Sequence, residues 1–328
     1  MTDPRNMIEL WRGDLRESWH CGHAVVCDER GEVVAAWGDP DATIYPRSSC
    51  KMMQALPMVE AGIRLPTERL ALACASHQGA PVHVEKVRAW LADLGLGDDD
   101  LLCGTEVSRD KDLKLRMIRE GESPCQVHNN CSGKHAGFLT FAQHLNAGPD
   151  YVDPDHPVQR AVRDAHEDLT GMDSPGFGID GCSAPNFATS VHGLARAMAC
   201  FAAAREGQGA RGDAMARLRD AMCLHPDLVA GETRACTDLM RAMGGRVAVK
   251  TGAEAVFVAM LPEQRLGVAL KVVDGATRAS EAAITALLVH LGVLDATHPA
   301  ARRYLDAPIL NRAGLEVGRV RAAEGFPI

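Results

Sequence analysis

The sequence predicts an α+β fold in which an antiparallel sheet, formed from both ends of the chain, packs against a large helical middle. Runs rich in β-forming residues occur near the start and again after residue 245, while apolar residues between them recur mostly at helical spacing. The last strands follow one another without intervening helices, which is typical of an antiparallel sheet. We therefore expect a single unit over residues 1–328, with a sheet subregion at about 9–47 plus 246–294 and a helical subregion at about 48–243.

The first strands are expected over residues 20–28 and 32–37, because both runs are rich in β-forming side chains. The short turn between them contains Gly31, where a hairpin turn is expected to need a positive φ. These two runs therefore predict a hairpin near the start of the sheet.

Helical spacing is clearest near the two ends of the middle segment. The positions that carry it are Met52, Met53, Leu56 and Val59 near the start, and Leu194, Met198 and Phe201 further on. Strand texture returns over residues 246–250, 255–261 and 266–273, and a final helix is expected from Arg278 to about Leu291.

The charge and aromatic content argue against a nucleic-acid partner. The 328-residue chain has 35 Lys and Arg against 43 Asp and Glu, a formal net charge of −8, so it gains little from counterion release on nucleic acid. Aromatic residues are only 4% of the chain, too few for a base-stacking platform. The phosphate-binding patterns GxGxxG and GxxxxGK[ST] are absent, which argues against a nucleotide ligand as well.

No segment predicts a membrane span or export. The longest mainly apolar run near the C-terminus covers residues 282–294, which is shorter than the roughly 20 residues needed to cross a bilayer. The N-terminus lacks a charged-then-apolar signal pattern. The 11 cysteines are odd in number and irregularly spaced, which is typical of reduced thiols, so we expect a cytoplasmic protein without disulfides.

The first candidate for chemistry is the motif Ser48-Ser49-Cys50-Lys51, which directly precedes an apolar helix. A serine and a lysine three residues apart share one helical face, so the lysine amine can reach the hydroxyl and remove its proton. The alternative is a purely structural role, in which a serine caps the helix and Lys51 is a solvated charge.

The second candidate is Lys250-Thr251-Gly252, between two expected strands. An early SxxK with a late KTG marks the penicillin-recognising serine enzymes, in which KTG lies on an edge of the sheet. The lysine supplies charge beside the nucleophile, and the glycine allows a backbone to approach the strand. Alone, KTG is a common turn tripeptide, but the pair of motifs together favours a functional role.

Two polar segments lie between these motifs. The segment ASHQG offers a second hydroxyl, Ser76, with Lys250 as its possible partner; the alternative is a turn that ends a helix. On spacing alone, His128, Cys131 and His135 could line one helical face and bind zinc.

A further segment, GIDGCSAPN, brings Asp180 and the thiol of Cys182 to the end of an expected strand. The alternative for this segment and for the possible zinc face is a set of capped helix starts and packed thiols.

Taken together, these motifs resemble the signature blocks of the rhizobial-type (class 3) L-asparaginases, the asparaginase II family. The blocks are IYPRSSCKMMQALP, ASHQG, HNNCSGKHAGFL, GIDGCSAPNFA and VKTGAEAVF, in the family's order over about residues 44–257. The resemblance implies a single catalytic unit with a fold similar to serine β-lactamases, penicillin-binding proteins and glutaminases, in agreement with the SxxK and KTG motifs.

The resemblance also implies roles for individual residues. Ser48 is the expected nucleophile with Lys51 as its base, and Ser76 with Lys250 is the expected second Ser–Lys pair. The expected zinc ligands are Cys131, Lys134 and Cys182, and the residues expected to bind substrate are Arg47, His135 and Asp180. A lysine ligand must lose its proton to bind a metal, so metal affinity is expected to fall as the pH drops.

The reaction that the resemblance implies is hydrolysis of L-asparagine to L-aspartate and ammonia through a serine acyl-enzyme, in a homodimer, with zinc positioning the substrate. One alternative is another serine amidase on the same fold, such as a glutaminase or a β-lactam hydrolase, because one methylene in a pocket is worth only about 1–3 kcal/mol. A second alternative is a non-catalytic amino-acid or zinc sensor. Such a sensor is expected to lack Ser48, Lys51 or Lys250, and all three are present.

Overall fold

The computed structural model describes residues 3–327 and divides into two compact units. Unit 1 comprises the chain up to Ser49, Thr189–Ala203, and the chain from Asp238 onward. Unit 2 comprises Cys50–Ala188 and Ala204–Thr237. Each unit is therefore assembled from segments that are distant in sequence.

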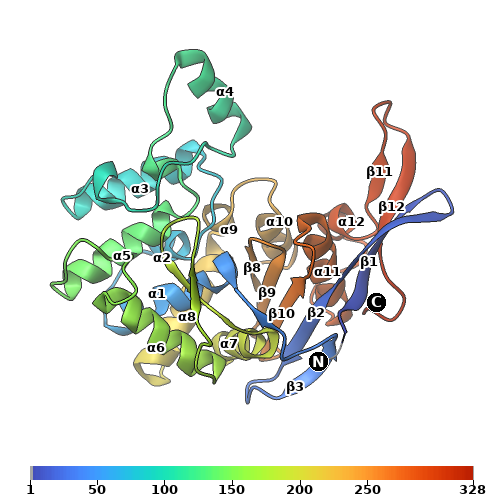
Figure 1. Ribbon diagram of the computed structural model, residues 1–328, viewed down its shortest axis with the longest axis horizontal. Helices are drawn as coiled ribbons and strands as arrows, with labels where there is room; N and C mark the ends of the chain where they lie inside the picture. Colours follow the sequence, from blue (N-terminus) through green and yellow to red (C-terminus); the bar gives the residue numbers. More distant parts are fainter. Residues whose placement is uncertain (1–2, 328) are drawn as a thin grey trace. The chain divides into compact units, whose positions relative to one another are not determined.

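Unit 1 contains an antiparallel sheet of eight strands in the order β11-β12-β1-β2-β10-β9-β8, with β3 paired to β2 (Figure 1). The first and last parts of the chain meet where β2 pairs with β10, for example at Val25 and Ala269. The predicted α+β class, with a sheet from both chain ends, is confirmed. The strands are β1 (Arg5–Arg12), β2 (Leu15–Cys27), β3 (Val33–Trp37), β8 (Ala248–Gly252), β9 (Val256–Leu261), β10 (Leu266–Val272), β11 (Pro308–Leu310) and β12 (Glu316–Ala322).

Two long helices of unit 1 pack on this sheet. Helix α7 (Val191–Ala203) contacts β2, β9 and β10, and α11 (Thr277–His290) contacts β1, β9, β10 and β12. Gly267 allows the approach of α7, because a Cβ at this position would lie 2.1 Å from the Ala199 nitrogen. The remaining elements of unit 1 are β4 (Thr43–Ile44) paired with β7 (Thr189–Ser190), the 3₁₀ helix η1 (Arg47–Cys50), which ends in unit 2, and the helices α10 (Ala235–Ala242), which begins in unit 2, and α12 (Pro299–Tyr304).

The sheet extends beyond the predicted subregion, which ends at residue 294. Strand β12 pairs with β1, with Val320 opposite Leu10, and β11 completes this edge of the sheet. Every residue of β12 is exposed or half-buried, and the strand carries Arg319 and Arg321. Its alternation of small or apolar residues with arginine covers only residues 318–322 and is at most half-buried, which makes it a weak strand signal.

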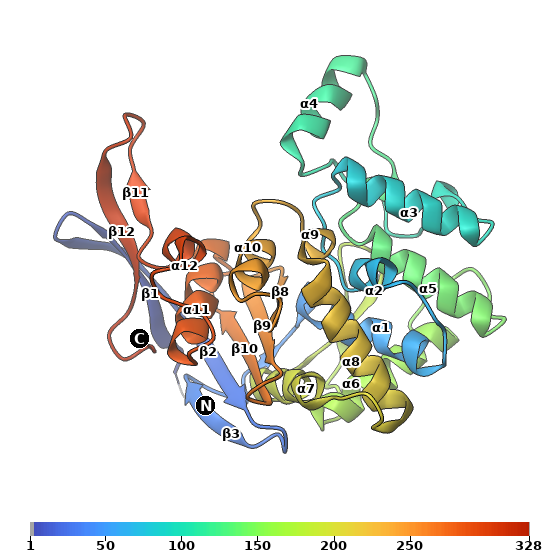
Figure 2. The same ribbon diagram turned by 180° about the vertical axis from the view of Figure 1, so that it is seen from behind.

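Unit 2 is mainly helical, and α1 lies at its centre. Helix α1 packs against α5, α6 and α8, which surround it in both Figure 1 and Figure 2. Its residues from Lys51 to Val59 are all buried. The helices are α1 (Lys51–Glu60), α2 (Thr67–Ala73), α3 (Pro81–Asp93), α4 (Lys111–Glu120), α5 (Ser132–His144), α6 (Pro157–Thr170), α8 (Gly209–Leu224) and α9 (Pro226–Val229). Short elements complete it: the 3₁₀ helices η2 (Asp98–Asp100) and η3 (Gln126–His128), and the hairpin of β5 (Phe177–Ile179) and β6 (Pro185–Phe187).

Within residues 3–327, no helix combines the length and the apolar character that a bilayer crossing needs.

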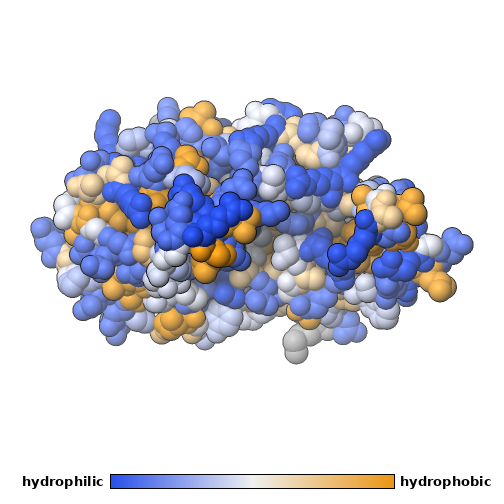
Figure 3. Space-filling view, turned by 90° about the horizontal axis from the view of Figure 1, so that it is seen from above, coloured by the Kyte–Doolittle hydropathy of each residue, from blue (hydrophilic) through white to orange (hydrophobic). Residues whose placement is uncertain are grey.

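The surface seen in Figure 3 is mainly hydrophilic, with scattered apolar areas. Leu310 of β11 and Leu315, just before β12, are among the exposed large apolar side chains, at 57% and 63% exposure.

Candidate functional site

The Ser48 segment lies in unit 1, in the 3₁₀ turn η1 that directly precedes α1. Arg47 has φ +53°, a left-handed conformation that costs a non-glycine residue free energy and occurs often at functional sites. Ser49 is fully buried, and its hydroxyl donates a hydrogen bond to the Pro46 carbonyl at 2.7 Å. Ser48 is half-buried. The hydroxyl of Ser49 is thus committed to the turn.

The KTG motif forms the end of β8, as the sequence predicts, and runs beside this turn inside unit 1. A Cβ at Gly252 would lie 2.6 Å from the Pro46 oxygen and 3.1 Å from the Ser49 nitrogen, so the glycine is needed for close backbone packing. Lys250 is fully buried, and its Nζ donates a hydrogen bond to the Thr251 carbonyl at 2.7 Å. The turn that carries Ser48 therefore packs against the KTG end of β8.

Lys51, the first residue of α1, is the centre of the polar cluster in unit 2. Its Nζ lies 3.0 Å from the Ser76 Oγ and 3.1 Å from the Cys131 Sγ, and it donates a hydrogen bond to the Ala75 carbonyl. The lysine is only 1% exposed. Such a buried amine requires hydrogen-bond partners, and these three supply them. The structure thus places Lys51 beside Ser76.

This contact differs from the pairing that the resemblance implies, in which Ser76 is partnered by Lys250 and Lys51 by Ser48. Ser48 and Lys250 belong to unit 1, whereas Lys51 and Ser76 belong to unit 2. Both implied pairings therefore stay predictions, and the Lys51–Ser76 contact is an additional finding.

The loop that carries Ser76 is fixed by backbone hydrogen bonds and by a buried histidine. Ser76 N donates to the Val229 carbonyl at 2.9 Å, and His77 N donates to the Asn130 carbonyl at 3.2 Å. The Ser132 hydroxyl donates to a carbonyl, so it accepts from His77 Nε2 at 3.0 Å. Burial lowers the pKa of His77 well below its usual range, which keeps the imidazole neutral. The loop is thereby tied to the start of α5.

Cys131, Lys134 and Cys182 meet within unit 2. Cys131 precedes α5 and Lys134 lies in its first turn, while Cys182 lies in the loop of the β5–β6 hairpin. Lys134 Nζ donates to Cys182 Sγ at 3.1 Å, and the three side chains are 5% exposed or less. Asp180 begins the same loop, and its carboxylate accepts a hydrogen bond from Gly181 N at 2.8 Å. The three residues implied as zinc ligands are thus adjacent.

The protonation of this cluster follows from its contacts. The contact with the Cys131 side chain, together with the nearby Lys134 charge, holds the pKa of Cys182 well below its usual range. The bond to Cys182, together with burial, raises the pKa of Cys131. Burial lowers the pKa of Lys134, but the two sulfur atoms outweigh it and raise the pKa overall. These shifts favour the deprotonated form of Cys182 and the protonated forms of Cys131 and Lys134.

The donor set fits a soft divalent metal such as zinc. No cluster of three His, Cys, Asp or Glu side chains suited to a metal occurs in the described part of the chain, so a metal held by Cys131 and Cys182 would need Lys134 as its third protein donor. Two sulfurs and an amine match the preference of zinc for sulfur and nitrogen. In addition, the buried His135 ring, whose Nδ1 contacts Tyr151, forms a side-chain hydrogen bond with Cys182. This imidazole therefore lies directly beside the cluster.

The ligand face suggested by spacing alone is not assembled. His128 lies in the 3₁₀ helix η3, and its Nδ1 accepts a hydrogen bond from Cys125 N at 3.1 Å. Burial and the Lys134 charge lower the pKa of His135 to about 4, so this histidine is neutral. His128 precedes α5 and therefore cannot share its face with His135.

Sequence reasoning missed two side chains that hold this cluster. Tyr151 Oη lies 2.9 Å from His135 Nδ1 and accepts from Leu102 N at 2.7 Å. Asn130 Oδ1 accepts from the Cys131 thiol at 2.9 Å. Asn130 lies within the HNNC block, directly before Cys131, so its position in the sequence could have indicated this contact. No sequence pattern points to Tyr151.

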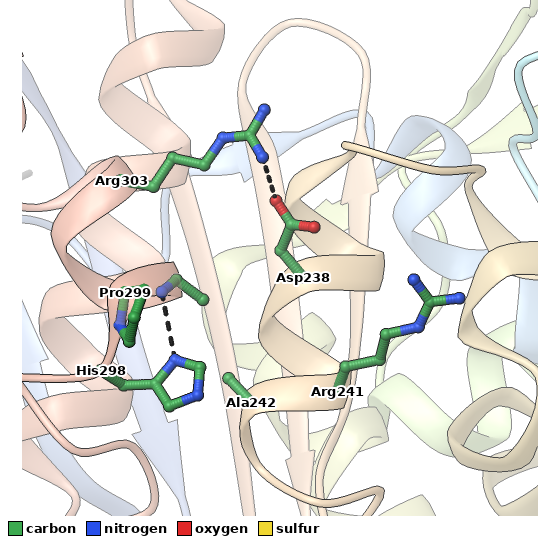
Figure 4. Close-up of a pocket in the computed structure, with 7 residues that line it drawn as sticks. Asp238, Arg241, Ala242, His298, Pro299 and Arg303 are labelled. Atoms are coloured by element: carbon green, nitrogen blue, oxygen red, sulfur yellow. Dashed lines mark hydrogen bonds and ion pairs between the residues drawn. The ribbon is translucent and has the colours of Figure 1, made fainter.

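A separate cavity of about 380 Å³ lies in unit 1 between α10 and α12 (Figure 4). Its described lining residues include none of the predicted site residues. Asp238 accepts hydrogen bonds from Arg303 at 2.9 Å and from Tyr304 at 2.6 Å, and His298 Nδ1 accepts from Ala300 N at 3.1 Å. Arg241 extends away from Arg303 in this view. The charged groups of this cavity therefore do not converge on one point.

Comparison with known proteins gives a family match over most of the chain. The family model described as L-asparaginase II matches residues 8–322. A search of curated proteins found no match.

Similar solved structures include the native form of Mglu, with a TM-score of 0.47 and 14% identity over 84% of this chain and 66% of that one. The chain thus spans slightly less than two thirds of that protein. Another is a putative beta-lactamase from Bacteroides dorei DSM 17855, with a TM-score of 0.42 and 10% identity over 76% of this chain and 84% of that one. The octameric penicillin-binding protein homologue from Pyrococcus abyssi has a TM-score of 0.36 and 12% identity over 83% of this chain and 73% of that one.

Proposed function

Because the chain belongs to the L-asparaginase II family, we propose that it hydrolyses L-asparagine to L-aspartate and ammonia. Family membership supports an amidase of the asparaginase and glutaminase kind. The observation that carries the proposal within the structure is the buried Lys51 amine, 3.0 Å from the Ser76 hydroxyl and 3.1 Å from Cys131. An amine held beside a serine hydroxyl is the arrangement that general-base activation of a serine requires.

In the proposed mechanism Ser48 attacks the side-chain amide carbon, and Lys51 accepts the proton. A neutral Lys51 has two N–H groups and one lone pair. In the structure Nζ donates to the Ala75 carbonyl, the Ser76 hydroxyl and the Cys131 sulfur; in the neutral form two of these contacts keep an N–H group, and the lone pair is left to accept the Ser48 proton. Ser76 is thus placed to pass a proton to and from Lys51.

The remaining roles follow the family resemblance. Lys250 supplies positive charge, and backbone N–H groups stabilise the oxyanion of the tetrahedral intermediate, where losing one donor typically costs about 10²–10³ in rate. Arg47 and Asp180 bind the charged groups of the amino acid, together with His135. Ammonia leaves, and water then hydrolyses the acyl-enzyme.

Cys131, Lys134 and Cys182 are the residues that would hold zinc. When bound, the metal would position the substrate as a Lewis acid rather than generate the nucleophile. The protein's own contribution is to keep these donors buried and adjacent, with Asn130 and Tyr151 fixing the side chains around them.

The test is ammonia release from L-asparagine and from L-glutamine, each measured with added zinc and with a chelator. We expect release from asparagine that the chelator lowers. Release from asparagine at the same rate with and without the chelator would support the asparaginase proposal and contradict a role for the metal. Release mainly from glutamine would assign a glutaminase, and no release from either amide would refute the amidase proposal.

We also propose a homodimer in the cytoplasm, as the resemblance and the cysteine content suggest. The exposed Leu310 and Leu315 offer apolar surface that a second copy could bury. Light scattering coupled to size-exclusion chromatography should give twice the 35.1 kDa chain mass; a single-chain mass would contradict the dimer.

A further inference from the structure

His77 directly follows Ser76 and is fully buried, yet the proposed hydrolysis gives its imidazole no part. The position of Ser76 matters to that reaction, because its hydroxyl lies 3.0 Å from Lys51 Nζ. The backbone of His77 is anchored to the Asn130 carbonyl at 3.2 Å. A ring held this close to Ser76 influences where the serine hydroxyl lies.

The hydrogen bonds at the two ring nitrogens of His77 define its tautomer. Gly79 N donates to Nδ1 at 3.1 Å, so Nδ1 carries no proton. The proton of the neutral ring is therefore on Nε2, which donates to the Ser132 hydroxyl at 3.0 Å, and this hydroxyl donates to the Val127 carbonyl at 2.9 Å. A second proton, on Nδ1, would face the Gly79 N–H. Both nitrogens are thus satisfied only in the neutral Nε2–H form.

His83, in the first turn of α3, fixes the plane of this ring. The two imidazoles are stacked, with ring centroids 4.7 Å apart and an angle of 10° between their planes. His83 Nδ1 accepts from Ala80 N at 3.1 Å, and its Nε2 donates to the Asp227 carbonyl at 2.9 Å. Burial, the neighbouring imidazole and the Lys51 charge lower the pKa of His77, and burial lowers the pKa of His83. Hydrogen bonding and burial therefore both favour two neutral, stacked rings.

The Ser76 loop is attached to two helices of unit 2. The Ser76 N–H donates to the Val229 carbonyl, at the end of α9, and the His77 ring reaches Ser132, the first residue of α5. Loss of the attachment to α5 would let the loop shift relative to Lys51. A shift of about 1 Å would break the hydrogen bond between Lys51 and Ser76. Misplacement of a catalytic group by this amount can cost about 10²-fold in rate.

We propose that His77 is a positioning residue: as a neutral Nε2–H donor to Ser132, it holds the Ser76 hydroxyl beside Lys51. His77 acts through Ser76 rather than on the substrate. Its effect on the rate rests on the proposed function, whereas its effect on the position of the loop does not.

Two substitutions of His77 separate the bond to Ser132 from the other contacts of the ring. Asparagine keeps an acceptor near the Nδ1 position but does not reach Ser132, whereas glutamine places an amide N–H near the Nε2 position. His77→Asn should lower kcat about 10- to 100-fold with little change in KM, because Ser76 transfers a proton and does not bind the substrate. His77→Gln should recover kcat to within about threefold of the unsubstituted protein.

Ser132→Ala tests the same bond from its other end and leaves His77 in place. Its kcat should fall by about the same factor as that of His77→Asn. The double substitution should cost little more than either single one, because both remove one shared bond. Losses that multiply in the double variant would contradict the proposal.

His156→Asn is the matched control. His156 is also buried in unit 2, its Nδ1 accepts from Val158 N at 3.2 Å, and its Nε2 lies 3.0 Å from the Gly148 carbonyl. This substitution should lower the free energy of unfolding and leave kcat unchanged. A loss of kcat equal to that of His77→Asn would be a general effect of removing a buried imidazole and would overturn the proposal.

Hydrogen exchange followed by mass spectrometry measures the loop independently of activity. Exchange in a peptide covering residues 74–79 should be faster in His77→Asn and Ser132→Ala than in the unsubstituted chain, and unchanged in His156→Asn. Faster exchange in a chain that never releases ammonia would uphold the positioning and refute the amidase. Ammonia release with unchanged kcat and unchanged exchange in both variants would refute the positioning and leave the amidase standing.

Discussion

Lys51 shows how a buried polar side chain organises its surroundings at the scale of single residues. Its Nζ contacts one carbonyl and one hydroxyl from the Ala75–Ser76 loop and one sulfur, that of Cys131, from a different segment of unit 2. Removing such a group would take one hydrogen bond from each partner, at a cost of about 0.5–1.5 kcal/mol for each bond. The contacts therefore define where Ser76 and Cys131 must lie.

The two candidate nucleophiles can be separated by substitution. Ser48→Ala should abolish turnover and leave the unfolding transition unchanged, because Ser48 is half-buried and would provide the attacking oxygen. Ser76→Ala should lower kcat by about 10²–10⁴, the range of a lost proton-transfer group. Steady-state ammonia release and circular dichroism measure both. Activity that survives in Ser48→Ala and disappears in Ser76→Ala would instead make Ser76 the nucleophile.

Metal affinity should depend steeply on pH. The pKa of Lys134 is raised because the sulfurs of Cys182 and Cys131 outweigh burial, and the pKa of Cys131 is raised by its bond to Cys182. Both groups must lose a proton before they bind zinc, so the apparent affinity should rise by about 100-fold per pH unit between about pH 6 and 8. Competition with a chromophoric chelator measures this slope.

Lys134→Met provides the control for this slope, because it removes one of the two protons and one ligand. Its affinity should be lower and should rise only about tenfold per pH unit. An affinity that does not change with pH in the unsubstituted chain would contradict the lysine ligand.

At the scale of elements, the end of β8 and the turn η1 are packed backbone against backbone. The approach of Pro46 and Ser49 to Gly252 leaves no room for a side chain. Gly252 was expected to let a substrate backbone approach the strand. Within unit 1, the backbone that approaches it is that of Pro46 and Ser49. Its role is therefore first of all structural.

Gly252→Ala should destabilise the protein by about 1–3 kcal/mol, the range of overpacking, because a Cβ would meet the Pro46 oxygen at 2.6 Å. It should also lower kcat, since the turn that carries Ser48 must shift. Gly148→Ala is the control: its Cβ would have no neighbour within 4 Å, and its unfolding free energy should change by less than about 0.5 kcal/mol. Chemical denaturation measures both, and equal effects of the two substitutions would contradict the close packing.

At the scale of the whole molecule, buried neutral histidines make the fold sensitive to acid. Burial lowers the pKa of His166 to about 4, and its Nε2 is buried without a hydrogen-bond partner. Below the unfolded-state pKa of about 6.5, the unfolded chain binds a proton that the folded chain does not. The stability associated with this residue is therefore complete above about pH 6.5 and is lost as the pH falls towards 4.

His166→Leu should remove this dependence. The unsubstituted protein should lose about 3 kcal/mol of unfolding free energy through His166 between about pH 6.5 and 4, and the variant should lose that much less. Urea unfolding at several pH values compares the two slopes. Identical slopes would show that His166 is already protonated in the folded state.

Much of the architecture could be predicted because it depends on local patterns. The runs at 20–28 and 266–273 have strand composition, and β2 and β10 lie there. Gly31 has φ +82°, as its turn requires. By contrast, β12 was missed because its residues are at most half-buried, and its strand geometry comes from pairing with β1.

By itself, the sequence determined the α+β class, the candidate residues and, through its motif blocks, the family. Motifs identify residue types and their order, since spacing along one helix or strand is a local property. Only the tertiary structure decided that Lys51 contacts Ser76 and Cys131, and that Lys134 contacts Cys182. These partners are 25, 80 and 48 residues apart. Such contacts arise from the packing of α1, α5 and the β5–β6 hairpin, which no local pattern encodes.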